Sequence, residues 1–121
     1  MSIHGIIRER LHAKAGLVER PKPKFTLEQL ASIQWSDIFE KYMRNRLMMG
    51  GLRYGVFGQK GKPKYNSIES IKRRIEQYEK TGNTEFLVDV ANLCMVEFVE
   101  GVHPNKHFSA SDDTNERVKK L

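Results

Sequence analysis

The stretch from residue 84 to residue 100 is the most apolar run of this sequence, and it constrains the fold more than any other feature. Its length and composition predict one α-helix of roughly four to five turns. Four polar residues of the run, Glu85, Asp89, Asn92 and Glu100, fall on one narrow stripe of such a helix. Because most of the remaining circumference is apolar, we expect the helix to be largely buried.

The acidic stripe of this central helix has two explanations. Burying carboxylates is costly unless a cation, an arginine or hydrogen bonds meet them. The stripe therefore either faces water or pairs with arginines from a neighbouring helix, or it forms a metal or ligand site. The sequence leaves both explanations open.

A second long helix is predicted upstream of the central one. Thr26 and Gln29 have the spacing of a capping box, which begins a short helix. Ser36 offers a second cap, after which the helical pattern continues over residues 37–49. Five glycines and one proline follow within residues 50–66, so we expect the helix to end at residue 49.

A third helix is predicted directly before the central one, over residues 67–80. Asn66 or Ser67 caps its start, and Gly82 suits the left-handed residue that closes a helix. The turn to the central helix is very short, which predicts an antiparallel helical hairpin. Arg74 lies beside the apolar stripe of this third helix and is placed to reach the carboxylates of the central helix.

These elements together predict an all-α protein, a helical hairpin plus a third long helix, with a glycine-rich basic loop and irregular termini. We expect a basic N-terminal arm over residues 1–25, a helical core over 26–113 and a frayed tail over 114–121. The apolar surface between Ile38 and Met49 is broad for three helices to cover, which favours a homo-oligomer.

The loop over residues 50–66 carries four basic and no acidic residues, interleaved with aromatic side chains. Glycines let backbone amides approach an anion, cations bind phosphate, and aromatic faces stack on a base. A ligand-free connection is the alternative. The residues that we assign to a phosphorylated ligand are Arg44, Arg53, Tyr54, Lys60, Lys62, Lys64, Arg74 and Asn92.

Composition indicates where the protein is found and which partners it has. The single cysteine, Cys94, cannot form an internal disulfide and is expected to fill the core, which favours a cytoplasmic location. No apolar run is long enough to cross a bilayer, so we expect no membrane association. The net charge of +6 also suits nucleic acid, but no recognition-helix motif supports that partner. His103 and His107 are metal ligands by type only, because Pro104 prevents a helical presentation of the pair.

Two acidic pairs carry a resemblance to a known family. With Asp37-x-x-Glu40 on one helix and Glu85-x-x-x-Asp89 on another, the chain resembles the all-α nucleotide pyrophosphohydrolases of the MazG-like type. This resemblance implies that Asp37, Glu40, Glu85 and Asp89 hold Mg²⁺, with Glu85 and Asp89 catalytic. The segments Arg53-Tyr-Gly, Tyr78-Glu-Lys-Thr-Gly-Asn83, Asp89-Val-Ala-Asn92 and His103-Pro-Asn are similar to small phage or mobile-element proteins without an assigned activity.

The resemblance implies a nucleotide-binding protein that cleaves a phosphoanhydride with magnesium. The chain departs from that family because Glu85 and Asp89 lie four residues apart where the family has three, and because the segment between the acidic motifs is longer. An incomplete metal site leaves two alternatives. One is a protein that sequesters nucleotide signals without cutting them, as anti-defence proteins of phages do, and the other is a basic nucleic-acid-binding accessory protein.

Overall fold

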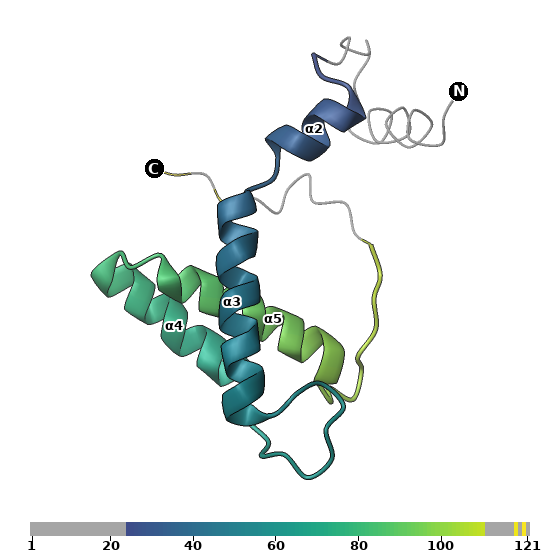
Figure 1. The fold of residues 1–121 in the computed structure, drawn as a ribbon, viewed down its shortest axis with the longest axis vertical. Helices are drawn as coiled ribbons and strands as arrows, with labels where there is room; N and C mark the ends of the chain where they lie inside the picture. The colour runs from purple at the N-terminus through teal and green to yellow at the C-terminus, as the bar shows by residue number, and fades with distance from the viewer. Residues whose placement is uncertain (1–23, 111–117, 119, 121) are drawn as a thin grey trace. The chain divides into compact units, whose positions relative to one another are not determined.

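The computed structural model of the chain describes residues 24–110, 118 and 120. These residues form four α-helices and no strand, which confirms the predicted all-α class. The chain divides into two compact units, residues 36–107 and the remainder. The helices are α2 (Leu27–Ile33), which belongs to the second of these units, and α3 (Asp37–Tyr54), α4 (Ser67–Thr81) and α5 (Glu85–Glu100), which form the first (Figure 1).

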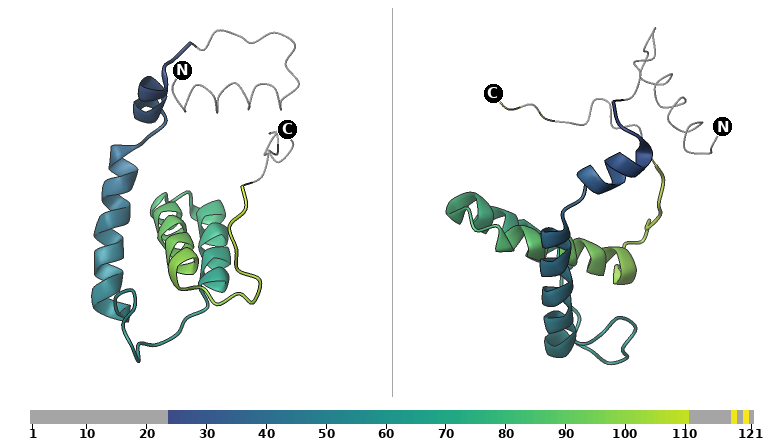
Figure 2. Two further views of the ribbon diagram at one scale, coloured as in Figure 1. Left: turned by 90° about the vertical axis from the view of Figure 1, so that its right-hand side faces the viewer. Right: turned by 45° about the horizontal axis from the view of Figure 1, so that its top comes forward.

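Within residues 36–107, α5 is the central element. It packs against α4 as an antiparallel hairpin and against α3, which crosses it (Figures 1 and 2). The turn of the hairpin depends on Gly82, which has φ of 70°, and on Asn83, whose side chain accepts a hydrogen bond from the Glu85 N–H at 3.1 Å. At the other end of α4, the Asn66 side chain accepts from the Glu69 N–H at 3.0 Å. The predicted hairpin and its caps are confirmed.

The starts of α2 and α3 follow from their capping residues. Thr26 and Gln29 form the predicted capping box, with reciprocal hydrogen bonds of 3.1 Å and 2.8 Å. Ser36 caps α3 by accepting from the Phe39 N–H at 3.1 Å. Local sequence alone therefore predicts where both helices begin.

The predicted end of α3 at residue 49 is wrong. The helix continues through Gly50 and Gly51 to Tyr54 and ends at Gly55, whose φ of 98° closes it. Each helical glycine costs only about 1 kcal/mol relative to alanine, which the surrounding turns can offset. A left-handed residue is a stronger stop, and a side chain at Gly55 would also lie 3.0 Å from the Cβ of Lys62.

The three helices bury little apolar surface. Among the described residues Val88, at 4% exposure, is the only buried hydrophobic residue, and the buried polar residues are Ser67 and Asn92. The central helix is covered by α3 and α4 but leaves Phe98 exposed at 68%. Cys94 lies exposed and does not fill a core as predicted, because its side of α5, which also bears Leu87 and Phe98, stays exposed.

The predicted basic arm and the predicted frayed tail lie almost entirely outside the described residues. In the described part of the chain, no helix is both long and apolar enough to span a membrane.

Candidate functional site

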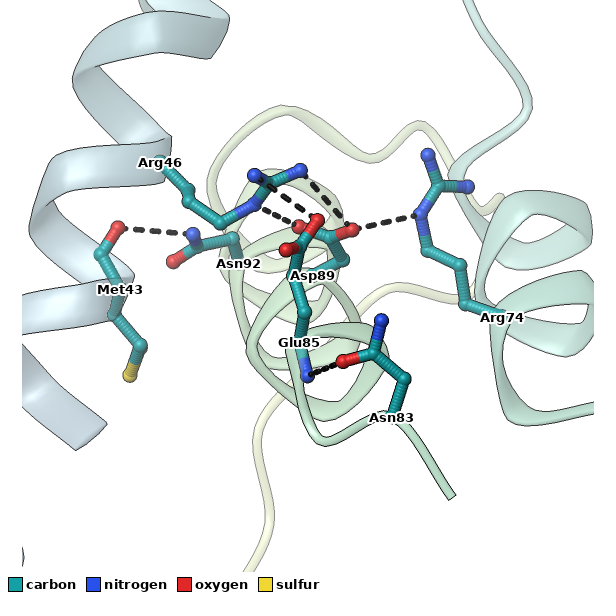
Figure 3. A network of polar contacts seen from close by, with 7 residues as sticks. All are labelled: Met43, Arg46, Arg74, Asn83, Glu85, Asp89 and Asn92. Carbon is teal, nitrogen blue, oxygen red and sulfur yellow. Dashed lines mark hydrogen bonds and ion pairs between the residues drawn. The ribbon is translucent and has the colours of Figure 1, made fainter. Parts of the chain in front are cut away.

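Two arginines from neighbouring helices meet the acidic stripe of α5. Arg46 of α3 donates from Nε to Asp89 Oδ1 at 2.6 Å and from Nη2 to Asp89 Oδ2 at 3.3 Å. Its Nη1 lies 3.2 Å from Glu85 Oε1, and Arg74 Nε of α4 lies 3.5 Å from Asp89 Oδ2 (Figure 3). We call Arg46, Arg74, Glu85 and Asp89 the arginine–carboxylate cluster. Through Asp89 of α5, the cluster connects all three helices of the unit.

The electrostatics of this cluster centre on Asp89. Its side chain is only 14% exposed, whereas that of Arg46 is 43% exposed. The hydrogen bond from Arg46 to Asp89 raises the pKa of the guanidinium, with a further contribution from the charge of Glu85. Since a poorly solvated carboxylate needs a cation or donors, the two arginines account for the acidic stripe.

Asn92 extends this contact one turn further along α5. Its Nδ2 donates to the backbone oxygen of Met43 at 2.9 Å, and its side chain is buried between α5 and α3 (Figure 3). Its Oδ1 has no hydrogen-bond partner among the described residues. Asn92 therefore positions α3 on α5, because its buried Nδ2 is hydrogen-bonded to a backbone oxygen of α3.

The carboxylates predicted to hold Mg²⁺ do not form one group. In the part of the chain that the structure describes, no three His, Cys, Asp or Glu side chains are placed to hold a metal ion. Asp37 and Glu40 lie in the first turn of α3, where Glu40 binds Arg44 at 2.9 Å. Arg46 occupies the position between Glu85 and Asp89 that a cation would take, so this arrangement does not fit a magnesium site. The magnesium site stays a prediction.

The glycine-rich loop over residues 55–66 is attached to the end of α5 by Glu100. Its Oε1 accepts from Lys62 Nζ at 2.6 Å, and its Oε2 accepts from the Gly58 N–H at 3.1 Å. These hydrogen bonds lower the pKa of Glu100, with the Lys62 bond as the larger cause. Lys62 Nζ also donates to Val56 O at 2.8 Å. The same lysine that pairs with Glu100 therefore holds the residues from Val56 to Lys62 together.

Aromatic side chains and cations without an ion pair lie exposed on this loop and on the adjoining last turn of α3. The rings of Tyr54 and Tyr65 meet edge to face at 5.3 Å, and both side chains stay half exposed or more. Phe57 lies under Lys62 Nζ, 5.8 Å from the ring centre. Arg53, Lys60 and Lys64 make no ion pair with any described residue and are exposed.

The predicted ligand residues thus separate into two sets. Lys62, Arg74, Arg44 and Asn92 bind other parts of the protein. The residues with no such ion pair or backbone contact are Arg53, Tyr54, Lys60 and Lys64. Of the contacts above that join two different helices, sequence reasoning predicted only that Arg74 reaches the central helix, while the pair of Glu40 and Arg44 within α3 also follows from their spacing.

Sequence reasoning missed Arg46 and the role of Glu100. Arg46 lies three residues after Met43 and four before Gly50, so the three residues share one face of α3. This spacing could have indicated that Arg46 lies on the face of α3 that meets α5. The contact between Lys62 and Glu100 spans 38 residues and has no local signal.

Comparison of the chain with protein-family models, curated proteins and solved structures found no match.

Proposed function

We propose that this chain binds a nucleotide or a nucleotide-derived phosphate through the loop over residues 55–66 and the adjoining last turn of α3. One observation carries the proposal. Arg53, Lys60 and Lys64 have no ion-pair partner among the described residues, although the loop that bears two of them is held in place by Glu100. Ordered loops with uncompensated cations attract anions.

The chemistry of the loop supports this ligand class. Arginine and lysine donors make charge-assisted hydrogen bonds to phosphate oxygens. Tyr54 and Tyr65 are 50% and 61% exposed, so their ring faces are accessible for stacking against a base. Gly61, with φ of 75° and open space around its Cα, lets the backbone approach the ligand closely.

We favour binding without cleavage, which corresponds to sequestration of a nucleotide signal in the cytoplasm. The support is that Glu85 and Asp89 already neutralise Arg46 and Arg74. Magnesium-dependent cleavage of a phosphoanhydride is the alternative, and it requires these carboxylates to release their arginines.

Calorimetric titration with nucleoside mono-, di- and triphosphates, in magnesium and in chelator, tests the proposal. We expect binding that survives chelator, with the ligand recovered intact by chromatography. Lys60→Ala and Lys64→Ala should each weaken binding by roughly tenfold, because each removes one charge-assisted contact worth about 1.4 kcal/mol. Lys72→Ala is the matched control, since Lys72 is an exposed lysine of α4 outside the loop.

Two results would redirect the interpretation. Magnesium-dependent product formation that Asp89→Asn abolishes would support the hydrolase. Indifference to free nucleotides, together with binding of single-stranded oligonucleotides that falls steeply with salt, would support the nucleic-acid partner. If loop variants and the Lys72→Ala control behave alike, the loop is not the binding site.

A further inference from the structure

A row of side chains on α3 faces away from α5. It consists of Ile38, Tyr42, Asn45, Met49 and Leu52, which we call the outer stripe. Its apolar members are 68%, 54%, 50% and 86% exposed in chain order. In the left view of Figure 2, the α4–α5 hairpin lies on one side of α3.

The spacing of the outer stripe is that of a coiled-coil seam. Successive members lie four, three, four and three residues apart, which is the heptad repeat of two helices that wrap around each other. Met43 and Leu47, which are half-buried, lie on the opposite side of α3, where the backbone oxygen of Met43 accepts from Asn92 of α5. The helix is therefore apolar on two sides, and α5 covers only one of them.

We propose that the outer stripe pairs with the outer stripe of a second copy of this chain, in antiparallel orientation, around a two-fold axis at Asn45. The pattern is nearly self-complementary, since Ile38 and Leu52 lie seven residues before and after Asn45, and Tyr42 and Met49 lie three before and four after it. An antiparallel pair places Ile38 of one copy against Leu52 of the other, and Asn45 against Asn45. A central polar pair of this kind fixes register in coiled coils.

The two orientations place different side chains beside the outer stripe. In an antiparallel pair Lys41 lies beside Met48, and the ring of Phe39, which is 38% exposed, lies beside the guanidinium of Arg53. Arg46 meets Lys41 of the other copy in a parallel pair and Arg46 in an antiparallel pair, and Glu85 and Asp89 compensate its charge in both.

A second copy would cover several large exposed side chains at once. The four apolar members of the outer stripe and the adjoining Met48 are each at least 50% exposed. The sparse core of the unit supports the same conclusion, because a chain that buries one hydrophobic residue in its described part gains much from covering a second face.

Sedimentation velocity between about 1 and 100 µM tests the surface. We expect a dimer for the wild type and a monomer, or at least a hundredfold weaker association, for Leu52→Asp. Val102→Asp is the matched control and should remain dimeric, because Val102 is 89% exposed but lies outside α3. A monomeric wild type at 100 µM, whatever covers the stripe, would overturn the proposal, as would a dimer that Leu52→Asp leaves intact.

Disulfide trapping tests the orientation and does not require a mutant monomer to fold. In a Cys94→Ser background, Ile38→Cys and Leu52→Cys proteins are oxidised separately and as a mixture. The antiparallel pair predicts that the mixture forms a cross-linked dimer and that neither protein does so alone, since bridged Cα atoms must lie within about 7 Å. Cross-linking of each protein with itself, and not in the mixture, would instead establish a parallel pair.

Discussion

Asp89 is the residue on which the packing of the helices most depends. It receives Arg46 from α3 and Arg74 from α4, and it is the least exposed carboxylate among the described ion pairs. Removing its charge leaves both arginines without their main acceptor, but these side chains are 43% and 38% exposed and regain water. The cost is therefore smaller than for a fully buried pair.

We predict that Asp89→Asn lowers the free energy of unfolding by about 1–2 kcal/mol, measured by urea denaturation followed by circular dichroism. Glu85→Gln is the control and should cost less than about 0.5 kcal/mol, because Glu85 is 53% exposed and meets only Arg46. A more stable Asp89→Asn protein would mean that the carboxylates repel each other and that the arginines do not bind them as described.

Glu100 makes the basic loop sensitive to acid. Its hydrogen bonds to Lys62 and Gly58 hold its pKa below the ordinary value of 4.5. A lowered folded-state pKa means that this contribution to stability is complete above the unfolded-state pKa and is lost as pH falls through the folded-state pKa.

We therefore predict that loop 55–66 detaches from α5 at a pH below the ordinary carboxyl pKa of 4.5, while the helices persist. The amide resonance of Gly58 in a pH series of NMR spectra reports this step. In Glu100→Gln the resonance should show no such step. A step of equal size in that variant would assign the effect to another carboxyl group.

Among the helices, α3 is destabilised by the glycine at position 50. A Cβ built on Gly50 meets no atom within 4 Å, and the residue lies inside the helix. We predict that Gly50→Ala raises the free energy of unfolding by about 0.5–1 kcal/mol, because alanine loses less backbone freedom on folding. Thermal denaturation should show a midpoint several degrees higher, roughly 4 °C or more per kcal/mol.

Gly82→Ala is the matched control for this substitution. Its Cβ also meets no atom within 4 Å, but the backbone has φ of 70°, where an L side chain is strained. We expect a loss of about 1 kcal/mol. If both substitutions had the same sign, the helical geometry of α3 at Gly50 would be in doubt.

At the scale of the whole molecule, the sparse core couples stability to association. If the outer stripe binds a second copy, unfolding must break that interface, and the melting temperature rises with protein concentration. We predict a rise of a few degrees between 2 and 200 µM, on the order expected from mass action. The melting temperature of Leu52→Asp should be lower and independent of concentration.

The sequence was informative wherever the determining contacts are local. Thr26, Ser36, Asn66 and Gly82 act within one turn of the chain, and each begins or ends a helix as their side chains predict. The hairpin followed from the short turn between two strongly periodic segments, and the all-α class followed from the same periodicity. Gly50 misled because a mid-helix glycine weakens a helix without ending it.

Which carboxylate meets which cation was decided only by tertiary structure. The sequence by itself determined that α5 bears an acidic stripe and that Arg74 shares a face with apolar residues. It did not determine that Arg46, and not Arg44, reaches Asp89, because this depends on how α3 crosses α5. The partner of Glu100 is likewise a lysine 38 residues away, and local periodicity carries no information about such separations.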